Sequence, residues 1–131
     1  MNTILALVLA ASNPACDWEV DKRVDPMTDA AVCIVTSPSA KIAFTKRGTD
    51  PMGVFVSSAY RRHGLTVRVD DNPAVYLGHN AYDSGPKLRR DVLPQIENGS
   101  RLRVRFTDYP HTQMGEAPIC NLPQLLAECG T

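Results

Sequence analysis

The stretch GSRLRVRFTDYP has arginines at three alternate positions, Arg101, Arg103 and Arg105. Their side chains are the first candidates for a binding function. The planar guanidinium group binds a carboxylate through two parallel hydrogen bonds. The residues between and after them are Leu102, Val104 and Phe106. This alternation is typical of a half-buried strand whose arginines face solvent, and Arg68, between two valines, predicts the same on another strand.

An acidic strip of the same period, Asp17, Glu19 and Asp21, leaves two interpretations of this arginine strip open. If the two strips lie on neighbouring strands, their charges pair across the strands and contribute only roughly a few tenths of a kcal/mol per contact. If they do not, the arginines form a binding surface for an acidic protein surface or an anionic polysaccharide.

A second cluster, Tyr60 to His63, places Tyr-Arg-Arg-His in one predicted turn. Histidines with a carboxylate and an arginine can run acid–base cleavage of a phosphodiester, and His79, Asp83 and His111 are available to complete such a set. A turn of this composition is more commonly a solvated hairpin end, and the chain has no G-x-S-x-G motif and no P-loop. We therefore expect no catalytic residues, and we count Arg61 and Arg62 among the candidate binding residues.

The four cysteines, Cys16, Cys33, Cys120 and Cys129, predict two disulfides in an oxidising compartment. No C-x2-C pair is present, so we expect no metal site. A helix running from residue 122 to Cys129 would hold Cys120 and Cys129 roughly 12 Å apart, beyond the reach of a bridge. Cys129 shares the apolar stripe of that helix and should face the sheet, where its candidate partners are Cys33, in an apolar strand, and Cys16. We prefer Cys33 with Cys129, which leaves Cys16 and Cys120 as a second pair or as free thiols.

The first fifteen residues resemble an export signal. Residues 4–11 form an apolar run that is far too short to span a bilayer, and small residues follow it at a plausible cleavage site. We expect a signal peptide over residues 1–15, a single β-rich domain over residues 16–131, and a periplasmic or secreted protein without a transmembrane segment. A lipid anchor at Cys16 is disfavoured, because Asn13 stands where a lipoprotein signal normally has Leu.

Composition limits the partners further. Fourteen basic residues balance fourteen acidic ones in the 131-residue chain, so no overall field draws it towards nucleic acid or an anionic membrane. One Trp, four Tyr and three Phe leave little material for stacking on bases. We expect no nucleic acid partner and no cofactor.

Turn signals divide the rest of the chain into short strands. We predict strands over residues 17–24, 31–36, 54–60, 65–70, 75–77 and 101–107. On the first of them Trp18, Val20 and Val24 share one side, and residues 31–36 form a hairpin with the strand that carries Ile42 and Phe44.

Two helical pieces interrupt the strands. The first has Leu88, Val92 and Ile96 on one face, with a break or restart expected near Asp91 because Pro94 cannot donate a helix hydrogen bond. Gly99 ends this segment. In the last helix Asn121 is the expected N-cap, Gly130 follows the end, and one apolar stripe is formed by Leu122, Leu125, Leu126 and Cys129.

The segments DWEVDKRVDPMTDAAVCIV, LTVRVDDNPAVYL, IENGSRLRVRF and APICNLPQLLAEC resemble small periplasmic modules of the invasion-associated locus B type and type VI secretion accessory proteins. The resemblance implies an exported β-sandwich-like domain without established catalytic residues. Its motif positions are expected to be structural: Trp18, Asp29, Arg68, Asp70, Gly99 and Cys129. A cysteine common shortly after the Trp is absent here, and CNLP replaces a Gly-containing turn, so the resemblance does not carry over a partner.

The sequence therefore predicts a mainly β fold, an antiparallel β-sandwich or open barrel with two short helices, the last one C-terminal. We expect an exported, non-catalytic binding or accessory module that acts through a β-sheet surface. The alternatives are a periplasmic inhibitor that inserts the AYRRHG loop into a hydrolase, and a small acid–base hydrolase that uses the Tyr60 to His63 turn.

Overall fold

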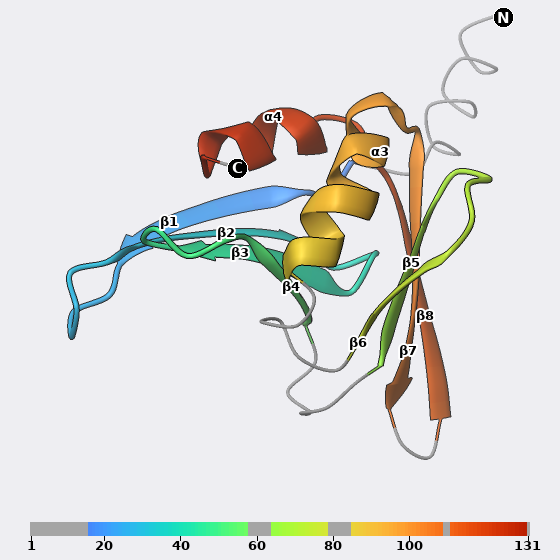
Figure 1. The fold of residues 1–131 in the computed structure, drawn as a ribbon, viewed down its shortest axis with the longest axis horizontal. Coiled ribbons are helices and arrows are strands. Elements are labelled where there is room, and N and C mark those ends of the chain that lie inside the picture. Colours follow the sequence, from blue (N-terminus) through green and yellow to red (C-terminus); the bar gives the residue numbers. More distant parts are fainter. Residues whose placement is uncertain (1–15, 58–63, 79–84, 109–110, 131) are drawn as a thin grey trace, which may run out of the picture.

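Two four-stranded antiparallel sheets make up most of the molecule (Figure 1). The computed structural model describes residues 16–57, 64–78, 85–108 and 111–130. The first sheet has the order β1-β2-β3-β4, and the second has the order β6-β5-β7-β8. The strands of the first sheet are β1 (Glu19–Val24), β2 (Ala31–Ser37), β3 (Ile42–Arg47) and β4 (Gly53–Val56). Those of the second are β5 (Leu65–Val69), β6 (Val75–Gly78), β7 (Arg101–Asp108) and β8 (His111–Pro118). The predicted mainly β fold with two short helices is confirmed.

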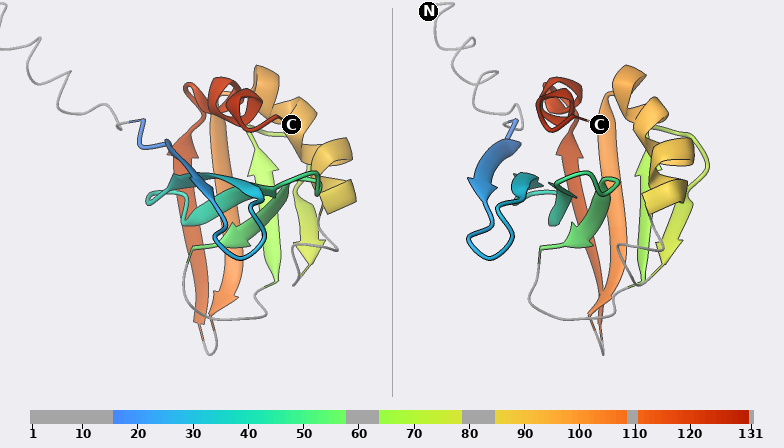
Figure 2. Two further views of the ribbon diagram at one scale, coloured as in Figure 1. Left: turned by 90° about the vertical axis from the view of Figure 1, so that its left-hand side faces the viewer. Right: turned by 60° about the vertical axis from the view of Figure 1, so that its left-hand side comes forward.

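The strands of the two sheets cross at a steep angle, and the core lies between them (Figure 2, left). The first sheet contributes Val35, Ile42 and Phe44 to this core. The second sheet contributes Leu65, Val67, Val69, Leu102, Val104 and Phe106. Alternate residues of β3, β5 and β7 thus face the core, because successive side chains of a strand point to opposite faces.

The first helical stretch combines η1 (Leu88–Val92), in π-helical geometry, with α3 (Leu93–Asn98). It contacts β5 and β6, and its apolar face of Leu88, Val92 and Ile96 is buried as predicted. The Leu93 N–H bonds to the Leu88 carbonyl, five residues back, and an α-helix restarts there with Pro94 in its first turn. The expected restart near Asp91 is therefore confirmed, because proline is tolerated where no N–H is needed.

Gly99 ends α3 as predicted, and packing explains why a glycine is needed. A Cβ at this position would lie 2.5 Å from Val69 Cγ1 and 2.8 Å from Ile119 Cδ1. The chain between α3 and β7 thus passes directly over the core.

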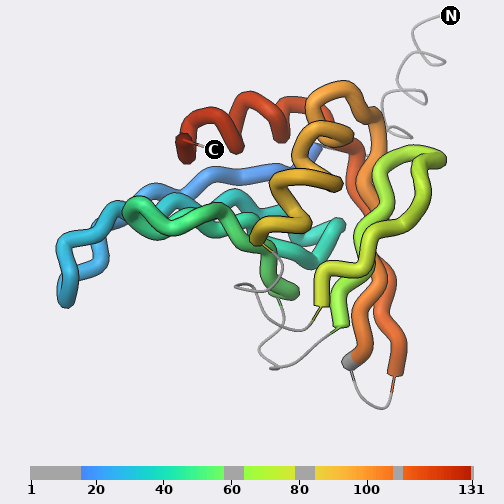
Figure 3. The backbone as a smooth tube through the Cα atoms, viewed as in Figure 1, coloured from blue at the N-terminus to red at the C-terminus, as the bar shows by residue number. Residues whose placement is uncertain are grey.

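The last helix, α4 (Leu122–Glu128), lies across the β1 end of the first sheet (Figures 1 and 3). Leu122 and Leu126 are buried, and Leu125 and Cys129 pack against the same core. Asn121 holds the predicted N-cap position, but its side chain makes no capping hydrogen bond. Gly130 follows the helix at a φ of 81°, which favours glycine.

Two disulfides join the beginning of the domain to its end. Cys33 of β2 bonds to Cys129 after α4, which confirms the preferred pair, and Cys16 bonds to Cys120. The Cα atoms lie 5.4 Å and 6.0 Å apart in these two pairs.

The three residues before β1, Cys16, Asp17 and Trp18, each bond to a distant part of the chain. Cys16 forms its disulfide, and Trp18 packs against Phe44 and donates its Nε1–H to the Pro118 carbonyl at 2.8 Å. The Asp17 carboxylate accepts hydrogen bonds from the Ser37 hydroxyl at 2.6 Å and from the Ser39 N–H at 2.9 Å. Partial burial raises the pKa of Asp17, but these hydrogen bonds outweigh it and hold the pKa below its ordinary value.

One prediction about the strands was wrong, and one strand was missed. Val24 does not share a buried face with Trp18, since its side chain is 61% exposed and β1 lies at the edge of the first sheet. β8 was not predicted, because its inward residues are Gly115 and Ala117, which carry no strong apolar signal. The strand expected over residues 54–60 is described as β4, Gly53–Val56, and residues 58–60 lie outside the described part.

Candidate binding surface

The arginine strip of β7 faces solvent, as its alternation predicted. Leu102, Val104 and Phe106 are buried in the core, whereas Arg101 and Arg103 are partly exposed and Arg105 is exposed. Arg68 of the neighbouring strand β5 also points outward, because Val67 and Val69 on either side are buried. We call this outward surface of the second sheet, with Arg68, Arg101, Arg103 and Arg105, the arginine face.

The acidic strip does not lie beside the arginine strip, so the interpretation that they pair across strands is wrong. Glu19 and Asp21 belong to β1, which pairs with β2 in the first sheet, whereas β7 lies between β5 and β8 in the second. Asp17 bonds to the turn between β2 and β3, and Asp21 pairs with Arg23. Matching periods are not enough to make two strands neighbours, since topology decides which strands meet.

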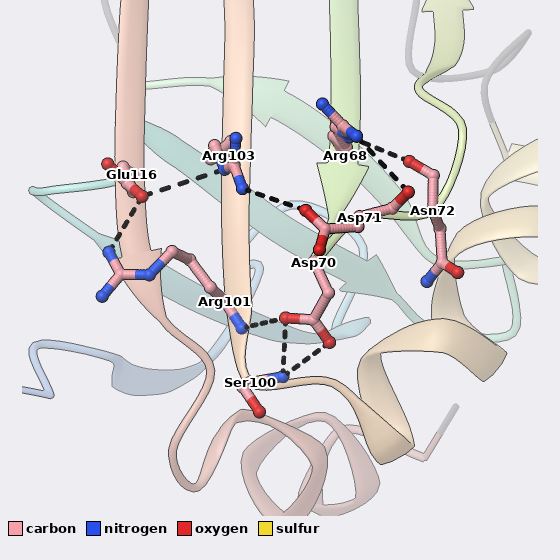
Figure 4. A network of polar contacts seen from close by, with 8 residues as sticks. All are labelled: Arg68, Asp70, Asp71, Asn72, Ser100, Arg101, Arg103 and Glu116. Atoms are coloured by element: carbon pink, nitrogen blue, oxygen red, sulfur yellow. Dashed lines mark hydrogen bonds and ion pairs between the residues drawn. The ribbon is translucent and has the colours of Figure 1, made fainter.

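The lower end of the arginine face in Figure 4 is fixed by Asp70, at the end of β5. Its carboxylate accepts hydrogen bonds from the backbone N–H groups of Ser100 and Arg101, and its own N–H donates to the Arg101 carbonyl at 2.9 Å. Asp70 adopts a φ of 51°, which is uncommon for a non-glycine residue. These bonds lock β5 against the start of β7 and so set the register of Arg68 and Arg103.

Arg68 braces the turn between β5 and β6. Its Nε donates to the Asn72 carbonyl at 3.0 Å, and its terminal nitrogen donates to the Asp71 carbonyl at 3.3 Å (Figure 4). Both acceptors are neutral backbone groups, so these bonds orient the guanidinium group without cancelling its charge.

Arg68 and Arg103 lie directly opposite each other on β5 and β7. Like charges in directly opposed cross-strand positions destabilise a sheet. Arg103 Nε is buried without a hydrogen-bond partner in the described part of the chain, and it lies 3.9 Å from the Glu116 carboxylate. A terminal nitrogen of Arg103 lies 3.9 Å from the Asp71 carboxylate. Arg103 is therefore partly exposed and only weakly paired.

Glu116 of β8 is the main acidic group on this face. It accepts a hydrogen bond from Arg101 at 2.9 Å, and Asp71, whose carboxylate lies 3.9 Å from Arg103, is 97% exposed. Exposed pairs contribute little, and four arginines against three carboxylates, Asp70, Asp71 and Glu116, leave a net positive surface.

Two exposed side chains complete the face, and sequence reasoning missed both. Register places Tyr76, Thr66, Arg105 and Met114 in one row across the four strands of the second sheet. The side chains of Tyr76 and Met114 are 48% and 58% exposed. Met114 and Glu116 were missed together with β8. The alternation of small inward residues with polar outward ones over residues 112–117 was the available signal.

The other predicted site residues form no site in the described structure. Tyr60, Arg61, Arg62, His63, His79 and Asp83 lie outside the described residues. His111 is exposed at the start of β8. No cluster of three or more potential metal ligands occurs in the described ranges, and no described helix is long and apolar enough to cross a membrane.

No protein-family model, curated protein or solved structure matches the chain. The resemblance to the periplasmic modules therefore rests on the sequence segments alone. Of the residues that it marks, Trp18 lies in the core, Gly99 packs over the core and Cys129 forms a disulfide. Asp29 adopts a φ of 59°, and Arg68 and Asp70 make hydrogen bonds at the end of β5.

Proposed function

We propose that the protein is an exported, non-catalytic binding module whose arginine face receives an anionic partner. The observation that carries the proposal is the opposed pair of Arg68 and Arg103, with four arginines gathered over two neighbouring strands. Neighbouring carboxylates compensate this charge only in part, and like charges opposed across two strands do not favour folding. A carboxylate-bearing partner would pair with the partly exposed Arg103 side chain and reduce the repulsion.

Export is supported by the two disulfides, which persist mainly in oxidising compartments. The apolar run over residues 4–11 is in keeping with a cleaved signal. Because the Tyr60 to His63 turn lies outside the described residues, the alternatives built on it, a hydrolase inhibitor and a small hydrolase, have no support from the described structure.

Capture from a periplasmic extract tests the proposal. The protein, purified with both disulfides formed, is immobilised beside two variants, Arg103→Gln and Arg23→Gln. Arg23 is the matched control, because it is an exposed arginine on a strand of the first sheet. We expect the wild type and Arg23→Gln to retain the same partner and Arg103→Gln to lose most of it, with all three chains melting at similar temperatures.

Equal capture by all three chains would contradict the proposal, because the partner would then bind elsewhere. Loss of capture that is accompanied by a large fall in the melting temperature of Arg103→Gln would also contradict it, since Arg103 would then be a structural residue.

A further inference from the structure

We infer that the partner of the arginine face is the acidic surface of a second, different protein rather than an anionic polysaccharide. This inference rests on the proposed function and adds to it the chemical class of the partner. Three features of the face carry it: all its cations are arginines, apolar side chains are exposed at its edges, and Arg103 is partly exposed with no close carboxylate.

All the cations of this face are arginines. The chain has four lysines, and none lies on the second sheet: Lys22 and Lys46 belong to the first sheet, Lys41 to the turn before β3, and Lys87 precedes η1. Arginine is enriched and lysine is depleted in protein–protein interfaces, because the guanidinium group is weakly hydrated and forms paired hydrogen bonds with carboxylates. A surface that only attracts a polyanion has no such reason to exclude lysine.

Apolar side chains flank the arginines at both edges of the sheet. Tyr76 on β6 and Met114 on β8 lie in the same cross-strand row as Arg105, and both are exposed. Tyrosine and methionine are enriched with arginine in protein interfaces, where they bury apolar area. A sulfated or carboxylated sugar offers little apolar surface to cover Met114, whereas a protein does.

The exposed part of Arg103 favours a fixed carboxylate. The Arg103 side chain is 38% exposed, and the carboxylates of Asp71 and Glu116 approach it no closer than 3.9 Å. A carboxylate held in place by a folded partner can pair with the exposed part of this side chain with directed geometry, which is characteristic of a protein interface.

The partner is not a second copy of this chain docked through the same face. A symmetric contact of that kind brings the arginines of both copies together, and their repulsion opposes it. The occupant is therefore a different protein with acidic residues around an apolar patch.

The test separates charge from apolar contact. Bound material is captured from periplasmic extract and identified, and its dissociation constant is measured for the wild type, Arg103→Gln, Met114→Ser and Met27→Ser. Polygalacturonate serves as the polysaccharide probe. Met27 is the matched control, because it is 89% exposed in the loop between β1 and β2 of the first sheet.

We expect one identified protein whose affinity falls about tenfold or more with Arg103→Gln and measurably with Met114→Ser, but not with Met27→Ser. Polygalacturonate should bind weakly and be indifferent to Met114→Ser.

Arg103-dependent binding of a polysaccharide, or of a protein that ignores Met114→Ser, would overturn this inference and leave the proposed function standing. An empty capture, or capture that ignores Arg103→Gln, would remove the proposed function and this inference with it.

Discussion

Single residues show which polar groups of this protein serve its fold. Asp70 and Asp17 each accept two or more hydrogen bonds that join segments far apart in the sequence. Arg103 has no comparable partner, although it lies between two strands that carry acidic and basic neighbours. The contrast separates residues that hold the structure from one that is available to a partner.

Asp17→Ala should lower the free energy of unfolding by about 1–2 kcal/mol at neutral pH, because two hydrogen bonds to a carboxylate are lost. The folded-state pKa lies below the ordinary 3.8, so the wild-type carboxylate stabilises the fold fully above the unfolded-state pKa. That contribution is lost as the pH falls through the folded-state pKa. Urea unfolding at pH 7 and at about pH 2 measures both differences.

Asp21→Ala is the control for this prediction, because the Asp21 side chain is exposed and forms an ion pair with Arg23, two residues away. An Asp17→Ala deficit that stays constant down to the lowest pH would show that the ionised carboxylate is not responsible.

At the residue scale the sequence predicted the outward arginines, the buried residues between them and the Cys33–Cys129 bond. It did not predict the partners of those arginines. Glu116 and Asp71 approach Arg103 only because β8 and the turn after β5 are brought beside β7, and long-range strand pairing leaves no mark in local alternation.

Among the elements, β8 depends on close approach rather than on apolar side chains. Its Gly115 lies against the turn between β2 and β3, so that a Cβ there would be 2.3 Å from the Ala40 carbonyl oxygen. In addition, the Glu116 N–H donates to the Ser39 carbonyl at 3.1 Å. The backbone of β8 thus contacts the turn between β2 and β3 and joins the two sheets.

Gly115→Ala should therefore destabilise the protein by about 1–3 kcal/mol, since the opposing atoms belong to the backbone and cannot rotate away. Gly85→Ala is the matched control, because its Cβ would meet the Met52 carbonyl oxygen at an ordinary 3.5 Å. Thermal melting of both variants measures the difference, and an equally stable Gly115→Ala would mean that the turn does not pack here.

Periodicity, turn residues and Pro94 predicted most of the strand and helix positions. They did not predict β8, because its inward residues are too small to form an apolar pattern. Its neighbours β5 and β7 were predicted individually, but their adjacency was not, because pairing between distant segments depends on the whole topology.

At the scale of the whole molecule, two disulfides link segments that are far apart in the sequence. The disulfides span sequence separations of 104 and 96 residues, and both link the N-terminal part of the domain to the segment around α4. In the chain-entropy model a closed loop of this length restricts the unfolded state strongly.

Replacing Cys33 and Cys129 together by Ala should lower the free energy of unfolding by about 2–5 kcal/mol. Urea unfolding measures this loss, and non-reducing peptide mapping of the wild type should give two linked peptide pairs. A linked pair that joins Cys120 to Cys129 would contradict the structure.

Intact mass of the protein from a periplasmic fraction tests export at the same scale. We expect a mature chain that begins between residues 13 and 16 and is four mass units lighter than its fully reduced form, because each of the two disulfides removes two hydrogens. A full-length chain with four free thiols would contradict both the signal and the disulfides.

The central claim is that the charge of the arginine face opposes folding and serves binding, and a double-mutant cycle on Arg68→Gln and Arg103→Gln tests it most directly. Since the two guanidinium groups repel, Arg103→Gln should change the free energy of unfolding differently in two backgrounds. The change should be more stabilising in the wild-type chain than in the Arg68→Gln chain, by about 0.2–1 kcal/mol at low salt. The difference should vanish at about 1 M salt, where charges are screened. A coupling of opposite sign, or none at low salt, would show that this pair does not oppose folding and would contradict the account.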